Sequence, residues 1–331
     1  MASRPTQRAT GSAPNKNVPV RSAPTQGNGQ QATSNNRQQQ STGAQRAAQG
    51  NAGEKTAAKP GRKYEWPHDA PQDARAAIHA AIELALALLK TKGGREELVG
   101  VGLYTTNYRV GDDKAEDEME AMANFFLSRL NAQFLRMNYS PTQGVPASYS
   151  ADAAWGAIKP EGFKADNPST NGSLTISQSV VRSMVSHSKA AKETKEDPLH
   201  PHHQNAYNSL LFALGASIAA SLVTCFVNFV TRTSPEYQRG YKVRAQSPWG
   251  DRWQRFALGG VVVSTQEQPH PLGHTQGGEL WVVNEKGNGL LISDSSVKEL
   301  VKHCFTRLPL KGQFNFPVAK QTKMESIWAG K

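Results

Sequence analysis

The sequence predicts a mainly α-helical protein with a smaller β portion and a long, disordered basic arm at its start. Apolar side chains recur at helical spacing in several segments between residues 70 and 230. Val-rich and aromatic runs separated by turn residues follow residue 238. The expected organisation has four parts: a disordered arm over 1–63, a helical core over 64–237, a mixed β-hairpin and helix part of the same domain over 238–308, and an extended basic tail over 309–331.

The arm concentrates the positive charge of the chain. Residues 1–63 contain ten Lys or Arg side chains and one acid, Glu54, whereas the whole chain has a net charge of +11. The arm therefore carries a net +9 and the rest of the chain only +2. It contains no aromatic residue. The arm has too little apolar surface to bury on folding to offset a backbone entropy cost of roughly 1–2 kcal/mol per residue. We therefore expect it to be disordered.

A mobile basic segment suits sequence-independent contact with phosphates, and a solubilising tail or plain linker is the alternative. The arm residues that we predict to bind RNA are Arg37, Arg46, Arg62 and Lys63. The strongly basic balance of the chain points to an anionic partner, which is a nucleic acid, an anionic membrane surface or an acidic protein.

Two cysteines, Cys225 and Cys304, are too few to staple 331 residues, and neither belongs to a CxxC pair. The sequence therefore predicts no disulfide framework and no cysteine-based zinc site, as is usual in a reducing compartment. The chain opens without the apolar run of a secretory signal.

Three long helices are expected in the core. The first covers residues 70–92 and ends at Gly93 and Gly94. Residues 98–110 are expected to be extended. The second helix covers residues 113–137, with an acidic start and a basic end that match the helix dipole. The third covers residues 175–192.

Loops and one short helix are expected between the long helices. Segments 139–150, 159–172 and 193–206 read as loops, and 151–158 reads as a short helix. The acidic segment 112–120 is interpreted as a solvated helix face, with the basic arm or tail of a neighbouring subunit as an alternative partner.

Residues 210–230 form the most apolar segment, with 21 residues and no charge. This length is sufficient to cross a bilayer. The segment also contains Ser217, Ser221, Thr224 and Asn228, and its flanks lack a one-sided cluster of Lys and Arg. The favoured interpretation is the central helix of a helical core, and a membrane span is the alternative.

Strands are expected over 241–245, 256–265, 279–284 and 290–293. The last two are joined by the turn Glu285-Lys286-Gly287-Asn288, which predicts a hairpin. A final helix is expected from Ser296 to Phe305, with Glu299 completing a capping box.

No catalytic signature is found. The chain has no GxxxxGK[ST], GxGxxG, GxSxG or HExxH pattern, so we expect neither an enzyme nor a cofactor. His200, His202 and His203 cluster beside prolines, with His187 upstream. An exposed linker is the expected role of this tract, and we predict no metal site.

The segment from Arg232 to Phe256 is the most informative for function, because basic side chains alternate with aromatic ones in it. Arg and Lys neutralise phosphates, and aromatic faces stack on unpaired bases for roughly 1–3 kcal/mol each. The competing interpretation is a surface turn whose aromatic rings lie in the core. The predicted RNA-binding residues of this segment are Arg232, Arg239, Tyr241, Lys242, Arg244, Trp249, Arg252, Trp253 and Arg255.

This organisation resembles that of RNA-virus coat and nucleocapsid proteins of the filamentous plant and fungal type. The likeness lies in the arm, the largely helical core over 64–232 and the basic, loop-like end, and not in a shared motif. The hairpins expected after residue 256 depart from the simplest filament subunits. The resemblance implies flexible arms that contact neighbouring subunits and a groove that holds one RNA strand.

The expected function is therefore that of a structural coat or nucleocapsid protein. It would bind single-stranded RNA, assemble with copies of itself, and be found in the virion and the host cytoplasm. The alternative is a membrane-associated viral accessory protein, a movement or replication-site factor, in which 210–230 spans the bilayer. An enzyme of unrecognised type is the third class.

Overall fold

The long central helix α5 organises the protein. A computed structural model describes residues 63–67, 69–106, 113–141, 145–150, 172–193, 199–233, 249–264, 279–314 and 316–317. These residues belong to one unit, Ala58–Lys331. The protein is mainly helical with two small sheets, which confirms the predicted fold class. The helices are α1 (Gln72–Lys90), α2 (Lys92–Thr106), α3 (Asp113–Ala132), α4 (Gln178–Glu193), α5 (His200–Thr233), α6 (Trp249–Ala257) and α7 (Asp294–Val301).

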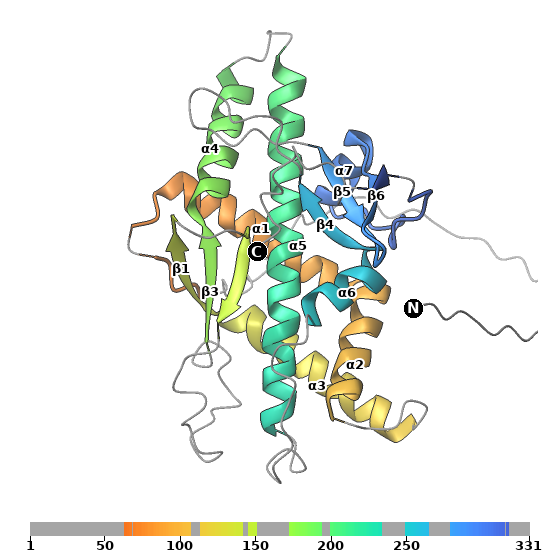
Figure 1. Ribbon diagram of the computed structural model, residues 1–331. Coiled ribbons are helices and arrows are strands. Elements are labelled where there is room, and N and C mark those ends of the chain that lie inside the picture. The colour runs from red at the N-terminus through yellow and green to blue at the C-terminus, as the bar shows by residue number, and fades with distance from the viewer. Residues whose placement is uncertain are drawn as a thin grey trace, which may run out of the picture. The chain divides into compact units, whose positions relative to one another are not determined.

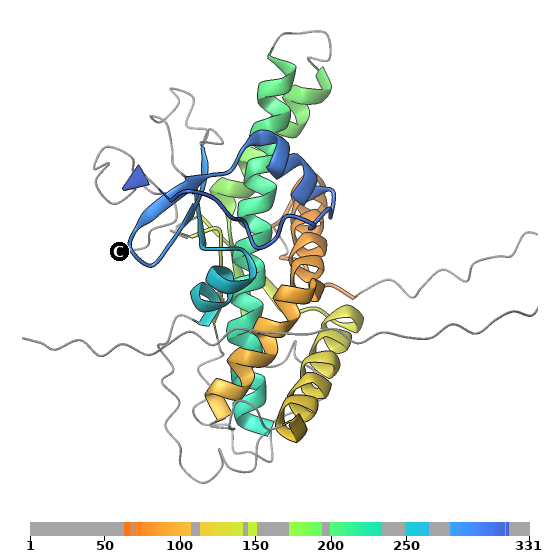
Figure 2. The same ribbon diagram turned by 90° about the vertical axis from the view of Figure 1, so that its right-hand side faces the viewer.

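Helix α5 contains the apolar segment 210–230 and lies among the other helices (Figures 1 and 2). Helices α1, α2, α4, α6 and α7 all pack against it. Gly215 permits a close approach of α1, since an added Cβ would lie 2.9 Å from Leu84. Within the described residues, α5 is the one helix long and apolar enough to cross a membrane, but 89% of its most apolar window is buried by the protein. This burial supports the interpretation of α5 as a core helix.

Helix α2 corrects the prediction of an extended segment over 98–110, because residues 98–106 are helical. Thr91 ends α1 and also starts α2, since its hydroxyl accepts a hydrogen bond from the Gly94 amide at 3.0 Å. Gly102 allows α2 to pack tightly, because an added Cβ would lie 2.4 Å from Met119 of α3. Gly102 therefore serves helix packing. Gly93 and Gly94, which were predicted to end the first helix, lie in the first turn of α2.

A three-stranded sheet lies inside the region predicted to be helix and loop. Its strands are β1 (Arg136–Ser140), β2 (Ala147–Ser150) and β3 (Ser173–Ser177), in the order β1-β3-β2. Strand β3 pairs in parallel with β1 and antiparallel with β2. The predicted helix over 113–137 therefore ends five residues early, and Met137 is buried in a strand.

The second sheet confirms the predicted hairpin. Its strands are β4 (Val261–Ser264), β5 (Leu280–Val283), β6 (Asn288–Leu291) and β7 (Phe316–Pro317), in that order. The β5–β6 turn is closed by Asn284, whose Oδ1 accepts hydrogen bonds from the amides of Lys286 and Asn288. A strand was expected over 256–265, but β4 begins only at Val261. The first two residues of the expected strand, 256 and 257, belong to the end of α6.

Two predicted helix boundaries are also corrected. Helix α7 is capped by Ser293, whose hydroxyl accepts from the Ser296 amide, so it starts before Ser296 and ends at Val301. Residues 200–206, expected to be an exposed linker, form the first turns of α5. The predictions for 1–62, 151–158 and 241–245 lie outside the described residues.

Candidate nucleic-acid interface

The predicted RNA-binding segment is described only from Trp249 onward. Arg239, Tyr241, Lys242, Arg244 and the side chain of Arg232 lie outside the described residues, as do Arg37, Arg46 and Arg62 of the arm. The described part of the segment is helix α6, which packs against α2 and α5.

The tryptophans of α6 point inward. Trp253 is fully buried, and its Nε1 donates a hydrogen bond to the Gly94 carbonyl oxygen at 2.8 Å. Trp249, one turn earlier, is 6% exposed. Gly250 lies against α5, where an added Cβ would be 2.7 Å from the Ala220 oxygen. The helix thus packs both rings into the core, which opposes the expectation that they stack on bases.

The outer side of α6 keeps its arginines and one aromatic ring at the surface. The Arg252 guanidinium lies 5.1 Å from the ring centre of Tyr104 and 5.4 Å from that of Phe256. Both rings are at least half exposed. We call Tyr104, Arg252, Arg255 and Phe256 the α6 surface.

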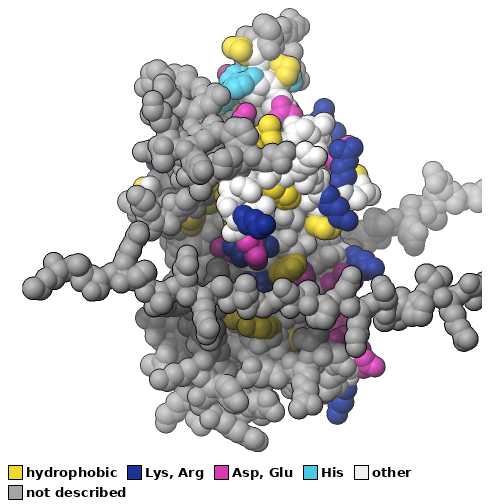
Figure 3. All heavy atoms as spheres, turned by 45° about the vertical axis from the view of Figure 1, so that its right-hand side comes forward, with side chains coloured by type: hydrophobic (Ala, Val, Ile, Leu, Met, Phe, Trp, Pro, Cys, Tyr) yellow, Lys and Arg dark blue, Asp and Glu magenta, His cyan; other side chains and the backbone are white. Residues whose placement is uncertain are grey.

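Acidic side chains accompany both arginines of the α6 surface. Arg255 pairs with Glu285 at 3.4 Å. Burial raises the pKa of the Glu97 carboxyl, and the charge of Arg252 opposes this shift. Figure 3 shows the same intermingling of basic and acidic side chains on the face that it presents. The α6 surface therefore offers little uncompensated positive charge.

Lys63, the last residue of the predicted arm, is fixed to the edge of the first sheet. Its amide donates to the Ala132 oxygen at 3.2 Å, and its oxygen accepts from the Phe134 amide at 3.1 Å. The residues that follow also pack together, since the ring centres of Tyr64 and Trp66 are 4.9 Å apart. The point at which the arm leaves the described fold is thus set by backbone pairing next to β1.

A hollow of about 640 Å³ opens beside this anchor. It is bounded by the segment that follows Lys63 and by strand β1. Its lining residues are Glu65, Trp66, Pro67, Asp69, Arg136, Met137, Asn138 and Tyr139.

Two further hollows continue from the first one along α1 and α4. The second, of about 410 Å³, shares Asp69 and Tyr139 with the first and adds Arg182. The third, of about 260 Å³, shares Asp73 and Lys189 with the second and adds Lys192. We call the three together the α1–α4 groove. Its charged and aromatic lining residues are Glu65, Trp66, Asp69, Asp73, Arg136, Tyr139, Arg182, Lys189, Lys192 and Tyr207.

Basic side chains line one wall of the groove. Arg182, Lys189 and Lys192 lie on the same side of α4, over about 15 Å of helix axis at 1.5 Å per residue. Lys189 pairs with Asp73 of α1 at 2.9 Å. None of the ion pairs among the described residues includes Arg182 or Lys192. Arg182 is therefore held in no ion pair, and the charge of Lys192 helps to lower the pKa of the Asp73 carboxyl that Lys189 already binds.

Tyr139 occupies the junction of the first two hollows. Burial raises the pKa of its hydroxyl, Arg182 opposes that rise and Asp69 adds to it. The ring is thus a neutral, half-buried surface next to an unpaired guanidinium. An arginine beside an aromatic ring suits a nucleotide, because the guanidinium can contact the phosphate and the ring can stack on the base. A free anion would use the arginine alone.

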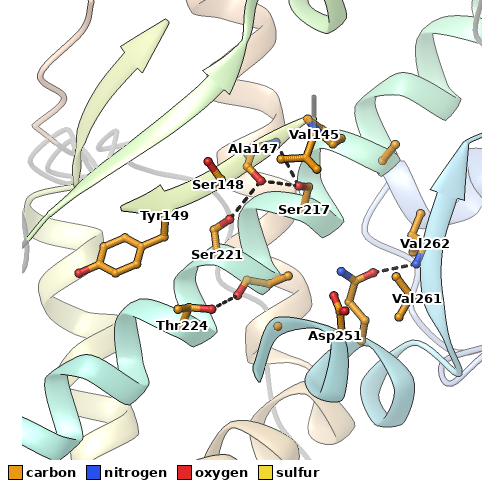
Figure 4. Close-up of a pocket in the computed structure, with 15 residues that line it drawn as sticks. Val145, Ala147, Ser148, Tyr149, Ser217, Ser221, Thr224, Asp251, Val261 and Val262 are labelled. Atoms are coloured by element: carbon orange, nitrogen blue, oxygen red, sulfur yellow. Dashed lines mark hydrogen bonds between the residues drawn. The ribbon is translucent and has the colours of Figure 1, made fainter. Parts of the chain in front are cut away.

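A separate cleft of about 290 Å³ lies between β2, α5, α6 and β4 (Figure 4). Ser217 and Ser221 donate to the Ala147 oxygen, and Ser217 also accepts from the Ala147 amide at 3.1 Å. Across the cleft, Gln254 accepts from the Val262 amide at 2.8 Å. These bonds satisfy the open edges of β2 and β4, so the polar lining has a structural use.

No metal site is assembled from the described residues. They contain no group of three or more His, Cys, Asp or Glu side chains that could hold a metal ion. Burial raises the pKa of the Cys225 thiol to about 12, which leaves it protonated and unreactive.

The chain matches no protein-family model, no curated protein and no solved structure. The sequence analysis placed the binding residues in the arm and in 232–256 and did not identify the α1–α4 groove. A signal was present, since Arg182, Lys189 and Lys192 share one face of α4. This helix was predicted over 175–192 but begins only at Gln178, because residues 175–177 belong to β3.

Proposed function

We propose that the protein is a coat or nucleocapsid protein that binds single-stranded RNA through its basic arm and the α1–α4 groove. One observation carries the proposal: the groove begins at the point where the arm joins the fold. Lys63 is anchored beside β1, and Glu65 and Trp66 line the first hollow. An RNA strand held by the arm would therefore enter the groove at its first hollow, where Arg136 is the lining cation.

The two parts supply different contacts. The arm, with its net charge of +9, gives sequence-independent affinity through phosphate neutralisation and counterion release. The groove adds fixed cations on α4 and the rings of Trp66 and Tyr139, which suit backbone contacts and stacking. Because neither part offers a set of bidentate base contacts, packaging would depend on assembly and not on sequence.

Self-assembly and residence in the virion and host cytoplasm complete the proposal. The supporting observation is the near neutrality of the fold, which carries +2 outside the arm. Copies of a nearly neutral body can pack side by side while their arms and grooves follow one RNA strand. Size-exclusion chromatography with absorbance at 260 and 280 nm tests assembly. A large species with a nucleic-acid-like ratio supports it, and a small species with a protein-like ratio opposes it.

The groove is tested by fluorescence anisotropy of full-length protein with a labelled oligouridylate. In the double variant Arg182→Gln and Lys192→Gln, we expect about tenfold weaker binding per lost contact. The slope of log affinity against log salt should become shallower by about 1.4, at about 0.7 per phosphate. The matched control is Lys298→Gln with Lys302→Gln, two exposed residues of α7 and its C-cap.

Equal affinities for the groove variant and its control would contradict the groove's role. The arm is tested separately by the variant Arg37→Gln, Arg46→Gln, Arg62→Gln and Lys63→Gln. It should lose affinity on every sequence alike and flatten the salt slope by up to about 2.8. A shallow salt slope for the unmodified protein would remove the whole proposal.

The alternative function, a membrane-associated accessory protein, requires α5 to leave its packing partners. Its mean hydropathy of 2.3 over the best window is the observation in its favour, and its burial is the observation against it. Carbonate extraction of the expressed protein distinguishes the two functions. A protein that resists extraction would favour the membrane reading over the coat protein.

A further inference from the structure

The cleft between β2, α5, α6 and β4 contains a buried amide that the fold uses only in part (Figure 4). Gln254 of α6 is 6% exposed, and its Oε1 accepts a hydrogen bond from the Val262 amide at 2.8 Å. Because the Val262 amide is a donor, this bond fixes which end of the Gln254 side chain is the oxygen. The Nε2 carries two donors and has no hydrogen-bond partner among the described residues. A buried amide with unused donors indicates a ligand that supplies an acceptor.

Asp251 places an acceptor next to this donor. It lies three residues before Gln254 on α6, and side chains at this spacing have Cβ atoms about 5–6 Å apart. Both residues line the cleft, and Figure 4 shows Asp251 across it from Ser217 and Ser221 of α5.

The Asp251 carboxylate has no ion pair or hydrogen bond among the described residues. Arg255 is the cation whose charge acts on it, and the Arg255 guanidinium is paired with Glu285. Burial raises the pKa of the Asp251 carboxyl, so its charged form gains stability from any N–H donor that replaces water. The first turn of α6 also favours the charged form, because the helix dipole is positive there.

The remaining lining of the cleft is apolar or already bonded. Val145, Pro146, Ala213, Val261 and Val262 supply apolar walls, and no Lys or Arg lines the cleft. Its volume of about 290 Å³ lies at the lower end of small-molecule sites, which hold roughly 300–1,000 Å³. The cleft therefore suits a small, uncharged ligand with an acceptor beside a donor group, and not a phosphate.

We propose that this cleft is a guanine site, in which the Asp251 carboxylate accepts from N1–H and the N2 amino group while Gln254 Nε2 donates to O6. These three groups are neighbours on the Watson–Crick edge of guanine, in the order donor, donor, acceptor. The two oxygens of one carboxylate match the two donors as a charge-assisted, bidentate pair.

Other ligands match the pair less well. Adenine, cytosine and uracil each present one donor group on the same edge, so one oxygen of Asp251 would lack a partner. A lysine or arginine side chain would meet the carboxylate but would also face the donors of Gln254, which repel a cation. The combination therefore selects guanine among the bases and disfavours a basic peptide.

Equilibrium dialysis of the full-length, RNA-free protein against guanosine tests the site. Because guanosine has no phosphate, neither the arm nor the α1–α4 groove contributes to its binding. We expect saturable binding with a dissociation constant below about 1 mM. Inosine, which lacks the N2 amino group, should bind about tenfold more weakly, and adenosine at least as weakly as inosine. The matched control ligand is 7-deazaguanosine, which keeps the Watson–Crick edge and should bind like guanosine.

The decisive variant is Asp251→Asn, which removes the charge and turns an N–H toward the guanine donors. It should bind guanosine at least about tenfold more weakly. The matched control is Asp113→Asn, an exposed carboxylate in the first turn of α3, which should leave guanosine affinity unchanged. If Asp251→Asn does not fold, the comparison of guanosine with inosine on the unmodified protein decides.

Three results would each overturn the guanine site. They are a lack of saturable guanosine binding up to about 1 mM, adenosine binding as tight as that of guanosine, and an unchanged guanosine affinity in folded Asp251→Asn. The site does not rest on the proposed function, so the groove variant Arg182→Gln with Lys192→Gln should bind guanosine normally.

A last comparison identifies the source of the base. An oligouridylate with one central guanosine is measured against the plain oligouridylate, on the unmodified protein and on Asp251→Asn. Tighter binding of the guanosine-containing strand that disappears in Asp251→Asn supports a guanine of an RNA strand as the ligand. Equal affinities for the two strands, together with guanosine binding, support a free guanine compound in the same site.

Discussion

The α6 surface and the α1–α4 groove both combine arginines with aromatic rings, yet they differ in what surrounds those groups. On the α6 surface, Arg255 pairs with Glu285 and Arg252 lies near Glu97. In the groove, Arg182 has no ion-pair partner among the described residues and lies next to Tyr139. Segment 232–256 is rich in Arg and aromatic residues, but its described part offers less available charge than a groove assembled from distant segments.

The difference teaches that local composition alone is a weak guide to a binding surface. Helix α6 is amphipathic, so its tryptophans go to the core and its arginines go outward to meet acids of neighbouring elements. A helix whose cations face a hollow is exposed to a ligand even when its own sequence is unremarkable. Four measurements test the difference between the two surfaces.

The largest effect is expected at Trp253. Trp253→Ala removes a fully buried ring and the hydrogen bond to Gly94, and should lower the free energy of unfolding by about 3–5 kcal/mol. Chemical denaturation measures it. The matched control is Phe256→Ala, in the same helix but half exposed, where a loss under about 1 kcal/mol is expected. A stable Trp253→Ala variant with weakened RNA binding would restore the ring as a binding residue.

The second prediction compares arginines directly. The pair Arg252→Gln and Arg255→Gln should weaken RNA binding less than about threefold, because Arg255 pairs with Glu285 and the charge of Arg252 acts on the carboxyl of Glu97. The groove pair Arg182→Gln and Lys192→Gln should weaken it by at least tenfold more, on the same probe and at the same salt concentration. A larger loss of RNA affinity in the α6 pair than in the groove pair would show that the α6 surface contributes more to binding.

The third prediction concerns the acid inside the groove. Asp73→Asn removes the partner of Lys189 and should raise RNA affinity about two- to fivefold, with a steeper salt slope. Asp73 is charged at neutral pH, since the hydrogen bond from Lys189 lowers its pKa. The gain should therefore shrink as pH falls through that lowered pKa, because protonation then discharges Asp73 in the unmodified protein. An unchanged affinity would indicate that the bound RNA does not contact Lys189.

The smallest effect is expected at Glu97. Burial raises the pKa of its carboxyl in the folded protein, so the charged form is disfavoured there. Its ionisation costs stability above the raised pKa, and the cost disappears below the ordinary value for an unfolded Glu of about 4.3. Glu97→Gln should therefore stabilise the protein at pH 7 by less than about 1 kcal/mol and have no effect at low pH. A destabilised variant at pH 7 would mean that its attraction to Arg252 outweighs burial.

Much of the fold could be predicted because helical periodicity is a local property. Helix α1 lies within the predicted range 70–92 and buries Ile78, Ile82 and Leu86 at helical spacing, and the β5–β6 hairpin lies where its turn residues indicate. The first sheet could not be predicted in this way. Strands β1 and β3 pair across more than thirty residues of sequence, and β1 follows a helical pattern without a break.

The candidate site was less predictable than the fold. Its lining comes from the segment after Lys63, from β1 and from α1, α4 and α5, so no single stretch of sequence displays it. The tryptophans of α6 could be read as stacking surfaces or as core, and only the packing of α6 on α2 and α5 distinguished the two.

The sequence by itself determined the separation of charge between arm and fold, the mainly helical class and the apolar central helix. Each of these follows from composition or from a period of a few residues, which no tertiary contact can alter. Tertiary structure alone decided which glycines join helices, which arginines keep their charge uncompensated and which polar side chains line the same cleft. Those properties depend on distances between residues far apart in the chain, and such distances arise only when the elements pack.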